Sequence, residues 1–341
     1  MAVTRGWGPK LTGRLAEYAK AEKTVLLGQI QNHMMREADK PSTRRQDIIH
    51  PSEMAKTGWC PLGTYLRIKA CREAENPFLK PKESYGVQLL NIFDEGHYIH
   101  DKWQRRLWDM GELWGQWYCN QCQGTFNATS PEFCIASHCR ADKKFLEYRE
   151  IGLRALETFL IAGHADGGVP KHKALIEIKS VGTGTVRVAN PELYKKYSEG
   201  QKVDLPGLWK GIEEPFPDHV NQGQLYLAIC ELMGLEFDKI IFLYESKFNQ
   251  GAKEFVVEYD PKHTDDMFVS ARQIKKALQG LTDPPVCPHN GCSDCEGKDY
   301  GTTLPEGLES GQYSEPERSE DSGSSRRIRR TGTTRKLGGV R

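Results

Sequence analysis

The sequence has 341 residues, with 38% hydrophobic and 27% charged residues and a formal net charge of +1. This length allows one large domain or two small ones, and the composition is ordinary for a globular protein. No apolar run approaches the roughly 18 residues that cross a bilayer, and residues 1–20 lack the apolar stretch of a signal peptide.

The first 50 residues are predicted to form a polar, helical N-terminal region. Residues 15–40 carry apolar side chains at helical spacing, and this helix is expected to end before Pro41. Residues 51–300 then form the main domain.

A long amphipathic helix is predicted within residues 83–111. Its apolar stripe is made of a few large side chains at helical spacing: Leu89, Phe93, Trp103 and Leu107. Gly111 is a plausible C-cap, and His100 lies close to the stripe.

The remaining elements alternate in type along the chain. In order, we expect strands at 157–166 and 173–181 joined by a turn at 167–173, a helix at 217–234, strands at 239–246 and 254–260, and a helix at 265–280. This order predicts an α/β sandwich. Residues 301–341 have almost no apolar content and are expected to be a disordered tail.

Two charged residues on the second predicted strand are the first signal of chemistry. Glu177 and Lys179 are two residues apart, so they project from one face of the strand, while Ile176 and Ile178 point into the core. Asp166 ends the preceding strand, and a hairpin would bring it beside Glu177. Two carboxylates at such a point form a hard oxygen site that suits Mg²⁺ or Mn²⁺.

Phosphodiester hydrolysis requires this combination of groups. A divalent ion withdraws charge from the phosphate and activates water, and Lys179 adds positive charge where negative charge develops. Taken alone, a Glu-x-Lys pair is usually a surface ion pair, and an Asp before Gly-Gly is usually part of a turn. The conjunction of the two favours a metal-dependent hydrolytic site.

Four short motifs resemble, in order, those of the RecB-like nucleases of the PD-(D/E)xK superfamily. The motifs are G-x-x-x-H, G-x-x-D, E-x-K and Q-x-x-x-Y, which occur here at Gly96–His100, Gly163–Asp166, Glu177–Lys179 and Gln222–Tyr226. The resemblance covers roughly residues 50–300 and implies a restriction-endonuclease-like α/β core. It also implies a metal-dependent deoxyribonuclease.

The resemblance assigns a role to each matching residue. His100 would join the metal shell, Asp166 and Glu177 would be the metal-binding carboxylates, and the Ile178 carbonyl would be a further ligand. Lys179 would be the catalytic lysine. Gln222 and Tyr226 lie four residues apart on one predicted helix and so share a face; they would help to hold the DNA and the lysine.

The ten cysteines favour metal binding over disulfides, because the chain shows no secretion signal. One group has the spacing C-x2-C-x11-C-x4-C, which is typical of a zinc ribbon: Cys119, Cys122, Cys134 and Cys139. We therefore expect Zn²⁺ in a zinc-ribbon-like insertion at 117–140. His138 is an alternative to Cys139 as the last ligand.

A second group follows the predicted nuclease core at 287–295. Iron–sulfur branches of the superfamily, such as the CRISPR-associated RecB-like exonucleases, place one cysteine before the core and three after it. That resemblance implies a [4Fe–4S] cluster here, held by Cys60, Cys287, Cys292 and Cys295. The C-x4-C-x2-C spacing departs from the family's, so zinc on the same residues, with His289 as a substitute ligand, stays open, as do unliganded thiols. Cys71 and Cys230 are assigned to ordinary burial.

Three functions remain open at this point. The first is an exonuclease, 5′→3′ on single-stranded DNA or DNA ends, acting with recombination, repair or replication proteins in the cytoplasm of a bacterium or a phage-infected cell. The second is a structure-specific or restriction-type endonuclease on the same core. The third is a non-catalytic DNA-binding or assembly protein, which the intact E-x-K motif disfavours.

Overall fold

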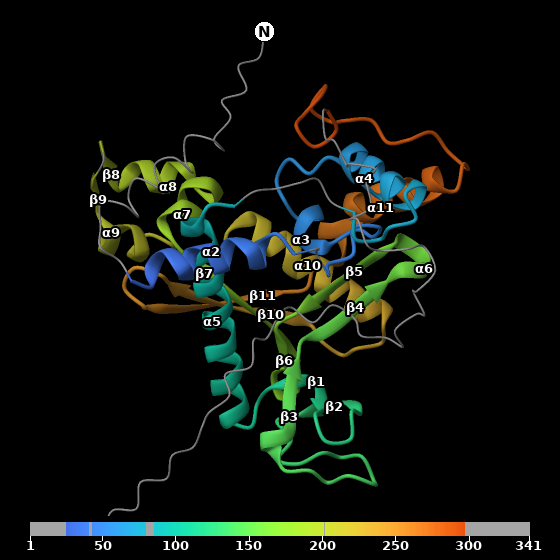
Figure 1. The fold of residues 1–341 in the computed structure, drawn as a ribbon. Helices are drawn as coiled ribbons and strands as arrows, with labels where there is room; N and C mark the ends of the chain where they lie inside the picture. The colour runs from blue at the N-terminus through green and yellow to red at the C-terminus, as the bar shows by residue number, and fades with distance from the viewer. Residues whose placement is uncertain (1–24, 41–42, 80–84, 201, 297–341) are drawn as a thin grey trace, which may run out of the picture.

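A mixed seven-stranded sheet forms the centre of the protein in the computed structural model, which describes residues 25–40, 43–79, 85–200 and 202–296 (Figure 1). Its strands are β1 (Trp114–Cys119), β2 (Thr125–Thr129), β3 (Leu146–Arg149), β6 (Gly167–Val169), β7 (Ala174–Val181), β10 (Lys239–Ser246) and β11 (Ala252–Glu258). The strand order is β11-β10-β7-β6-β1-β2, with β3 also paired to β1. Among these described strands only β7 and β10 pair in parallel.

Two short hairpins and several helices surround this sheet. The hairpins pair β4 (Ile151–Ala155) with β5 (Ile161–Ala165) and β8 (Ser198–Glu199) with β9 (Lys202–Val203). The helices are α2 (Leu27–Ala38), α3 (Pro51–Met54), α4 (Pro61–Glu73), α5 (Val87–Asp109), α6 (Leu156–Phe159), α7 (Thr183–Ala189), α8 (Pro191–Lys196), α9 (Leu205–Lys210), α10 (Pro217–Leu232) and α11 (Asp265–Leu278).

The alternation of side chains along β7 places a core on each face of the sheet. Leu175 belongs to the large core shared with α4, α10 and α11. Ile176 and Ile178 point the other way and pack with Ile99 of α5. The predicted α/β arrangement is therefore confirmed, with α10 and α5 covering opposite faces of β7.

The helices α5, α10 and α11 lie where the sequence predicts helices. Gly111 has φ +78° one residue beyond the C-cap of α5, so the predicted helix end is confirmed. The predicted stripe is buried only in part, because Leu89 and Phe93 remain exposed. The predicted N-terminal helix is present as α2; its first residues, 15–24, lie outside the described residues, as does the tail at 301–341.

The hairpin beside Glu177 differs from the prediction. Residues 161–165 pair with β4, and the hairpin partner of β7 is β6, where Gly167 lies opposite Ile176. The first residues of the expected turn at 167–173, Gly167–Val169, therefore form a strand. The physical reason is close packing, because a Cβ on Gly168 would lie 2.9 Å from the Phe237 ring. These glycines admit neighbouring side chains and do not form the turn.

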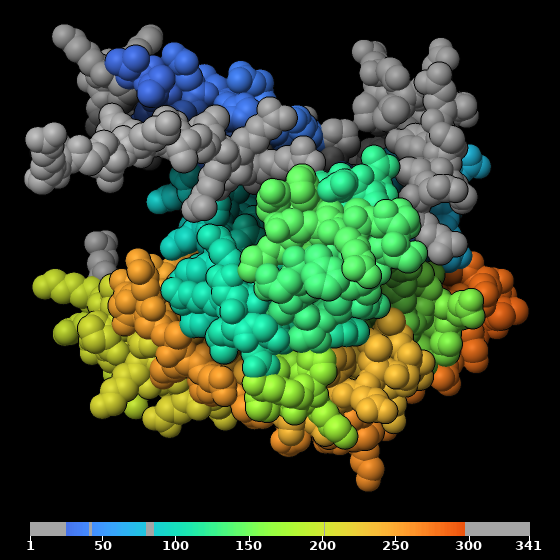
Figure 2. All heavy atoms as spheres, turned by 90° about the horizontal axis from the view of Figure 1, so that it is seen from below, coloured from blue at the N-terminus to red at the C-terminus, as the bar shows by residue number. Residues whose placement is uncertain are grey.

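The region at 117–140 contains strands that the sequence did not indicate. β1 extends the main sheet through one pair with β6, Trp114 opposite Gly168. Leu113, Trp117 and Leu146 form a small core here together with the cysteines. Viewed from below, the teal and green atoms of α5 and β1–β3 gather on one face (Figure 2). Within the described ranges, no helix combines the length and the hydropathy that crossing a bilayer requires.

Candidate active site and metal centres

Seven polar side chains from separate elements meet beside β7. They come from α5, from the β3–β4 and β5–β6 junctions, from β7 itself and from α10: His100, Glu150, Asp166, Glu177, Lys179, Gln222 and Tyr226. Six of the seven are the side chains expected from the sequence. Glu150 was not expected.

Asp166 is fixed at both its side chain and its backbone. Its Oδ1 lies 3.1 Å from His100 Nδ1, and its Oδ2 accepts a hydrogen bond of 2.6 Å from the Ile178 N–H. Its carbonyl accepts from Gln104 Nε2 at 3.1 Å and from the Tyr148 hydroxyl at 3.0 Å. The residue between β5 and β6 is therefore held by α5, β3 and β7 at once.

Lys179 is held by two acceptors, one of them Glu177 on the same face of β7. Its Nζ donates to Glu177 Oε1 at 2.7 Å and to Gln222 Oε1 at 2.9 Å. The Gln222 amide donates in turn to Glu177 Oε1 at 3.0 Å and to the Tyr226 hydroxyl at 2.7 Å. The predicted shared face of the Q-x-x-x-Y pair is confirmed, and it faces the E-x-K pair.

The site concentrates negative charge away from water. Burial, together with the neighbouring Asp166 charge, raises the pKa of Glu150 to about 8 and that of Glu177 to about 7. Burial would lower the pKa of His100, but the Asp166 carboxylate beside it raises that pKa to about 9. Burial also opposes ionisation of Asp166, yet His100 and Lys179 together lower its pKa.

Two observations show that the residues fit a divalent cation. Ligand atoms of His100, Glu150 and Asp166 all lie within 4.8 Å of one another. Glu177 stands outside this trio, and its buried Oε2 has no hydrogen-bond partner among the described residues. A hard cation would satisfy that oxygen and offset the repulsion among the carboxylates. For Ile178 the described bond uses its N–H, so a ligand role for its carbonyl stays a prediction.

Glu150 is the member that sequence reasoning missed. It follows β3 and precedes β4, two strands of four and five residues, and it belongs to none of the four motifs. No pattern in the sequence marks it. It enters the site because the chain between the two strands passes His100 and Asp166.

The first cysteine group assembles where the sequence predicts it. The sulfurs of Cys119, Cys122, Cys134 and Cys139 lie within 4.8 Å of one another, with Sγ–Sγ distances of 3.7 Å for Cys119–Cys139 and 3.8 Å for Cys122–Cys134. His138 is not part of the group. The four thiols could bind one metal ion.

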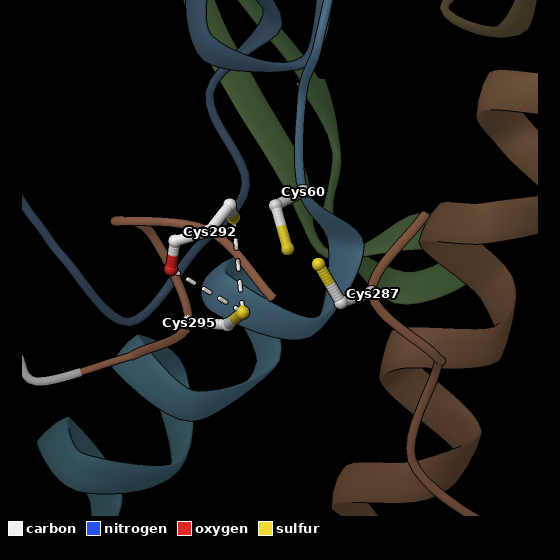
Figure 3. Close-up of side chains that lie close together, drawn as sticks. All are labelled: Cys60, Cys287, Cys292 and Cys295. Carbon is white, nitrogen blue, oxygen red and sulfur yellow. Dashed lines mark hydrogen bonds between the residues drawn. The ribbon is translucent and has the colours of Figure 1, made fainter. Parts of the chain in front are cut away.

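The second cysteine group joins two distant parts of the chain. Cys60 at the N-cap of α4 points toward Cys287, Cys292 and Cys295, and all four sulfurs lie within 4.8 Å of one another (Figure 3). His289 is occupied elsewhere, since its Nε2 lies 2.9 Å from the Gly58 carbonyl. Cys71 and Cys230, outside both groups, are buried as expected.

Comparison with known proteins shows no family model and no curated protein that matches this sequence. Several solved structures are similar in part. An alkaline exonuclease, LHK-Exo, from Laribacter hongkongensis is 11% identical with a TM-score of 0.39, covering 73% of this chain and 93% of its own. Its complex with dAMP is 11% identical with the same TM-score of 0.39, covering 69% and 90%.

The third similar structure is that of SSO0001, which is 12% identical with a TM-score of 0.33 and covers 77% of this chain and 90% of its own. TM-scores this low establish neither a shared fold nor a shared activity. What this chain does is therefore argued from its own residues.

Proposed function

We propose that the protein is a metal-dependent deoxyribonuclease of the RecB-like PD-(D/E)xK type, acting as an exonuclease on single-stranded DNA or DNA ends with 5′→3′ polarity. The observation that carries this proposal is the convergence of the four motifs on one site. His100, Asp166, Glu177 and Lys179 come from three places in the chain and form one group, in which Asp166 and Glu177 are buried and His100 and Lys179 are partly exposed.

The chemistry of the group supports hydrolysis of a phosphodiester. Bound Mg²⁺ or Mn²⁺ would supply a Lewis acid for the phosphate and lower the pKa of an attacking water. The residues positioned to hold it are His100, Glu150 and Asp166, with the unpaired oxygen of Glu177. Mg²⁺ and Mn²⁺ suit these ligands better than soft metals do.

The lysine completes the site on the same face of β7 as Glu177. Lys179 Nζ is held by Glu177 and Gln222, so the position of its charge is fixed. The side chain therefore loses little conformational entropy when substrate binds. A fixed cation at that position stabilises charge that develops on the phosphate. Tyr226 orients the Gln222 amide through the hydroxyl and so keeps the lysine in place.

The direct test is digestion of DNA labelled at the 5′ or the 3′ end. Wild-type protein with Mn²⁺ or Mg²⁺ should release short products from single-stranded DNA, starting at the 5′ end. Lys179→Ala should lose at least about 100-fold in rate, because a fixed charge at the transition state is removed. Lys276→Ala, an exposed lysine on α11, is the matched control and should digest DNA like the wild type.

The outcomes separate the competing activities. Nicking or linearisation of a circular single strand or duplex would replace the exonuclease with an endonuclease on the same core. Digestion that persists in Lys179→Ala would overturn the site assignment. Binding of DNA without digestion in either metal would favour a DNA-binding or assembly protein.

A cellular role follows from the activity. An enzyme that shortens DNA from free ends would act beside recombination, repair or replication proteins, in the cytoplasm of a bacterium or a phage-infected cell.

The Cys119 group fits a tetrahedral zinc site, because two of its sulfur pairs are 3.7 and 3.8 Å apart and all four sulfurs lie within 4.8 Å of one another. We include Zn²⁺ at that group in the proposal as a structural ion.

A further inference from the structure

The Cys60 group ties the start of α4 to the last described segment of the chain. Cys60 lies at the N-cap of α4, and its three partners lie in a loop that follows α11 (Figure 3). One cysteine before the predicted nuclease core and three after it resemble the iron–sulfur branches of the superfamily, and this resemblance implies an iron–sulfur cluster for these residues. The separations between the sulfur atoms allow that implication to be examined.

A single tetrahedral ion and a cubane require different sulfur separations. Four thiolates on one zinc ion, each at about 2.3 Å, have sulfur atoms about 3.8 Å apart. On a [4Fe–4S] cubane each thiolate binds a different iron, which spreads the thiolate sulfurs to roughly 6 Å. The two cofactors are therefore distinguishable from the protein alone.

The observed separations match the single ion. Cys292 Sγ and Cys295 Sγ are 3.7 Å apart, and every pair among the four sulfurs falls within 4.8 Å. The first cysteine group, whose spacing is that of a zinc ribbon, has the same separations of 3.7 and 3.8 Å. A cubane would require all four thiolates to move apart.

The backbone around the group resists such an expansion. A Cβ on Gly63, in the first turn of α4, would lie 2.6 Å from the Asp294 carbonyl oxygen, so the loop already touches the helix backbone. Cys60 Sγ accepts a hydrogen bond of 3.3 Å from the Gly63 N–H. The Cys292 carbonyl accepts from the N–H groups of Cys295 at 3.1 Å and Glu296 at 2.9 Å, which closes a tight turn between two ligands.

We propose that Cys60, Cys287, Cys292 and Cys295 bind one tetrahedral zinc ion in place of the [4Fe–4S] cluster that the resemblance implies. Zinc with four thiolates is a closed, structural site with no position for substrate. The inference does not depend on the nuclease proposal, because it rests on sulfur geometry and not on the residues beside β7.

The ion would link the segment after α11 to the N-terminus of α4. Thr64 and Arg67 of α4 hold Glu53 of α3 by hydrogen bonds of 2.8 and 2.7 Å. A zinc ion at Cys60 therefore stabilises a unit of α3, α4 and the Cys287–Cys295 loop. Its loss should lower the melting temperature.

Metal analysis of the purified full chain tests the proposal. The protein is produced in iron-supplemented medium and purified without oxygen, so that an iron–sulfur cluster would be both built and kept. We expect about two zinc ions per chain and no absorbance band in the 400 nm region. Cys292→Ala should retain about one zinc ion, and Cys292→Ala combined with Cys139→Ala should retain none.

Cys71→Ala is the matched control, because Cys71 is a buried cysteine on the same helix α4 but outside the group. It should keep about two zinc ions. A brown protein with iron and sulfide near four each per chain, lost in Cys292→Ala, would overturn the proposal. A wild-type protein that contains only one zinc ion per chain, and loses that ion in Cys139→Ala, would also overturn the proposal. If Cys292→Ala fails to fold, the wild-type metal content decides by itself.

Discussion

Glu150 shows how a single side chain can change the character of a site. His100 and Asp166 alone offer two ligands, which is a weak site for a hard cation. Glu150 adds a partly buried carboxylate within 4.8 Å of both, and desolvation together with the Asp166 charge raises its pKa to about 8. A divalent ion would offset both effects.

Replacing Glu150 should therefore weaken metal use more than stability. We expect Glu150→Gln to lower kcat/KM for DNA by about 100-fold and to raise the Mn²⁺ concentration needed for half-maximal rate. Titration of activity with Mn²⁺ measures both. Glu147→Gln, three residues earlier on β3, is the control and should change neither. Equal Mn²⁺ requirements for Glu150→Gln and wild type would remove Glu150 from the metal shell.

His219 gives the protein a sensitivity to acid, although it is not one of the candidate metal ligands. Burial, followed by the nearby Lys179 charge, lowers the pKa of His219 to about 3. The Tyr244 hydroxyl accepts from the Phe216 N–H and is hydrogen-bonded to His219 Nδ1. The folded pKa lies below the unfolded value of 6.5, so this contribution is complete above pH 6.5 and is lost as pH falls toward 3.

The free energy of unfolding should therefore decrease as the pH falls from 6.5 toward 3. Between pH 6.5 and 3, His219 should cost up to about 1.4 kcal/mol of stability per pH unit. In His219→Phe, urea unfolding between pH 7 and pH 4 should show a smaller loss than in wild type, even though the variant is less stable at pH 7. Parallel pH dependences of the two proteins would mean that His219 does not titrate in this range.

At the scale of elements, glycines decide which strands pair. Gly167 and Gly168 have the sequence character of a turn, but as β6 they form the hairpin with β7 that carries Asp166 past Ile178. Gly63 acts in the same way on α4, where it allows the Asp294 backbone to approach. In both places the missing side chain permits a long-range contact.

Gly63→Ala tests this role directly. The added Cβ would meet the Asp294 carbonyl at 2.6 Å, so the cysteine-bearing loop must move away from α4. Alanine also favours the helix itself by about 1 kcal/mol, so a local helix effect would be stabilising. We expect a lower melting temperature and faster release of one metal ion to a chromogenic chelator. Gly28→Ala, an open position on α2, is the control; metal release as slow as in wild type would contradict the contact.

At the scale of the whole molecule, the two cysteine groups lie at different ends. The Cys119 group belongs to the β1–β3 region, and the Cys60 group to α4 and the segment after α11 (Figure 1). The first group is linked to the candidate active site through β3. Tyr148 of that strand donates to the Asp166 carbonyl, and Glu150 is the first residue after the strand.

Loss of the two metal ions should consequently have different effects on activity. Cys139→Ala should disturb β1 and β3 and raise the Mn²⁺ requirement for DNA digestion by about tenfold, as indirect support of metal ligands commonly does. Cys292→Ala should lower the melting temperature while leaving the Mn²⁺ requirement of the folded protein unchanged. Mn²⁺ titrations of both variants below their melting temperatures measure the contrast. An unchanged requirement in Cys139→Ala would show that β3 holds its position without the ion.

The sequence by itself determined the local part of this protein. Helical periodicity placed α5 and α11, the two-residue repeat placed Glu177 and Lys179 on one face of β7, and cysteine spacing identified the first thiol group. These features depend on neighbours a few residues apart, and backbone geometry fixes such relations whatever the rest of the chain does. The motif order predicted six of the seven side chains at the site.

Only the tertiary structure decided the long-range part. In the tertiary structure the hairpin partner of β7 is β6 and not β5, and β1 belongs to the main sheet. Glu150, which no motif marks, lies beside His100 and Asp166. The tertiary structure also fixed the separation of sulfurs that come from both ends of the domain. Strand pairing and ligand separation are set by packing between segments far apart in the chain, such as Gly168 against Phe237, and no local pattern records those contacts.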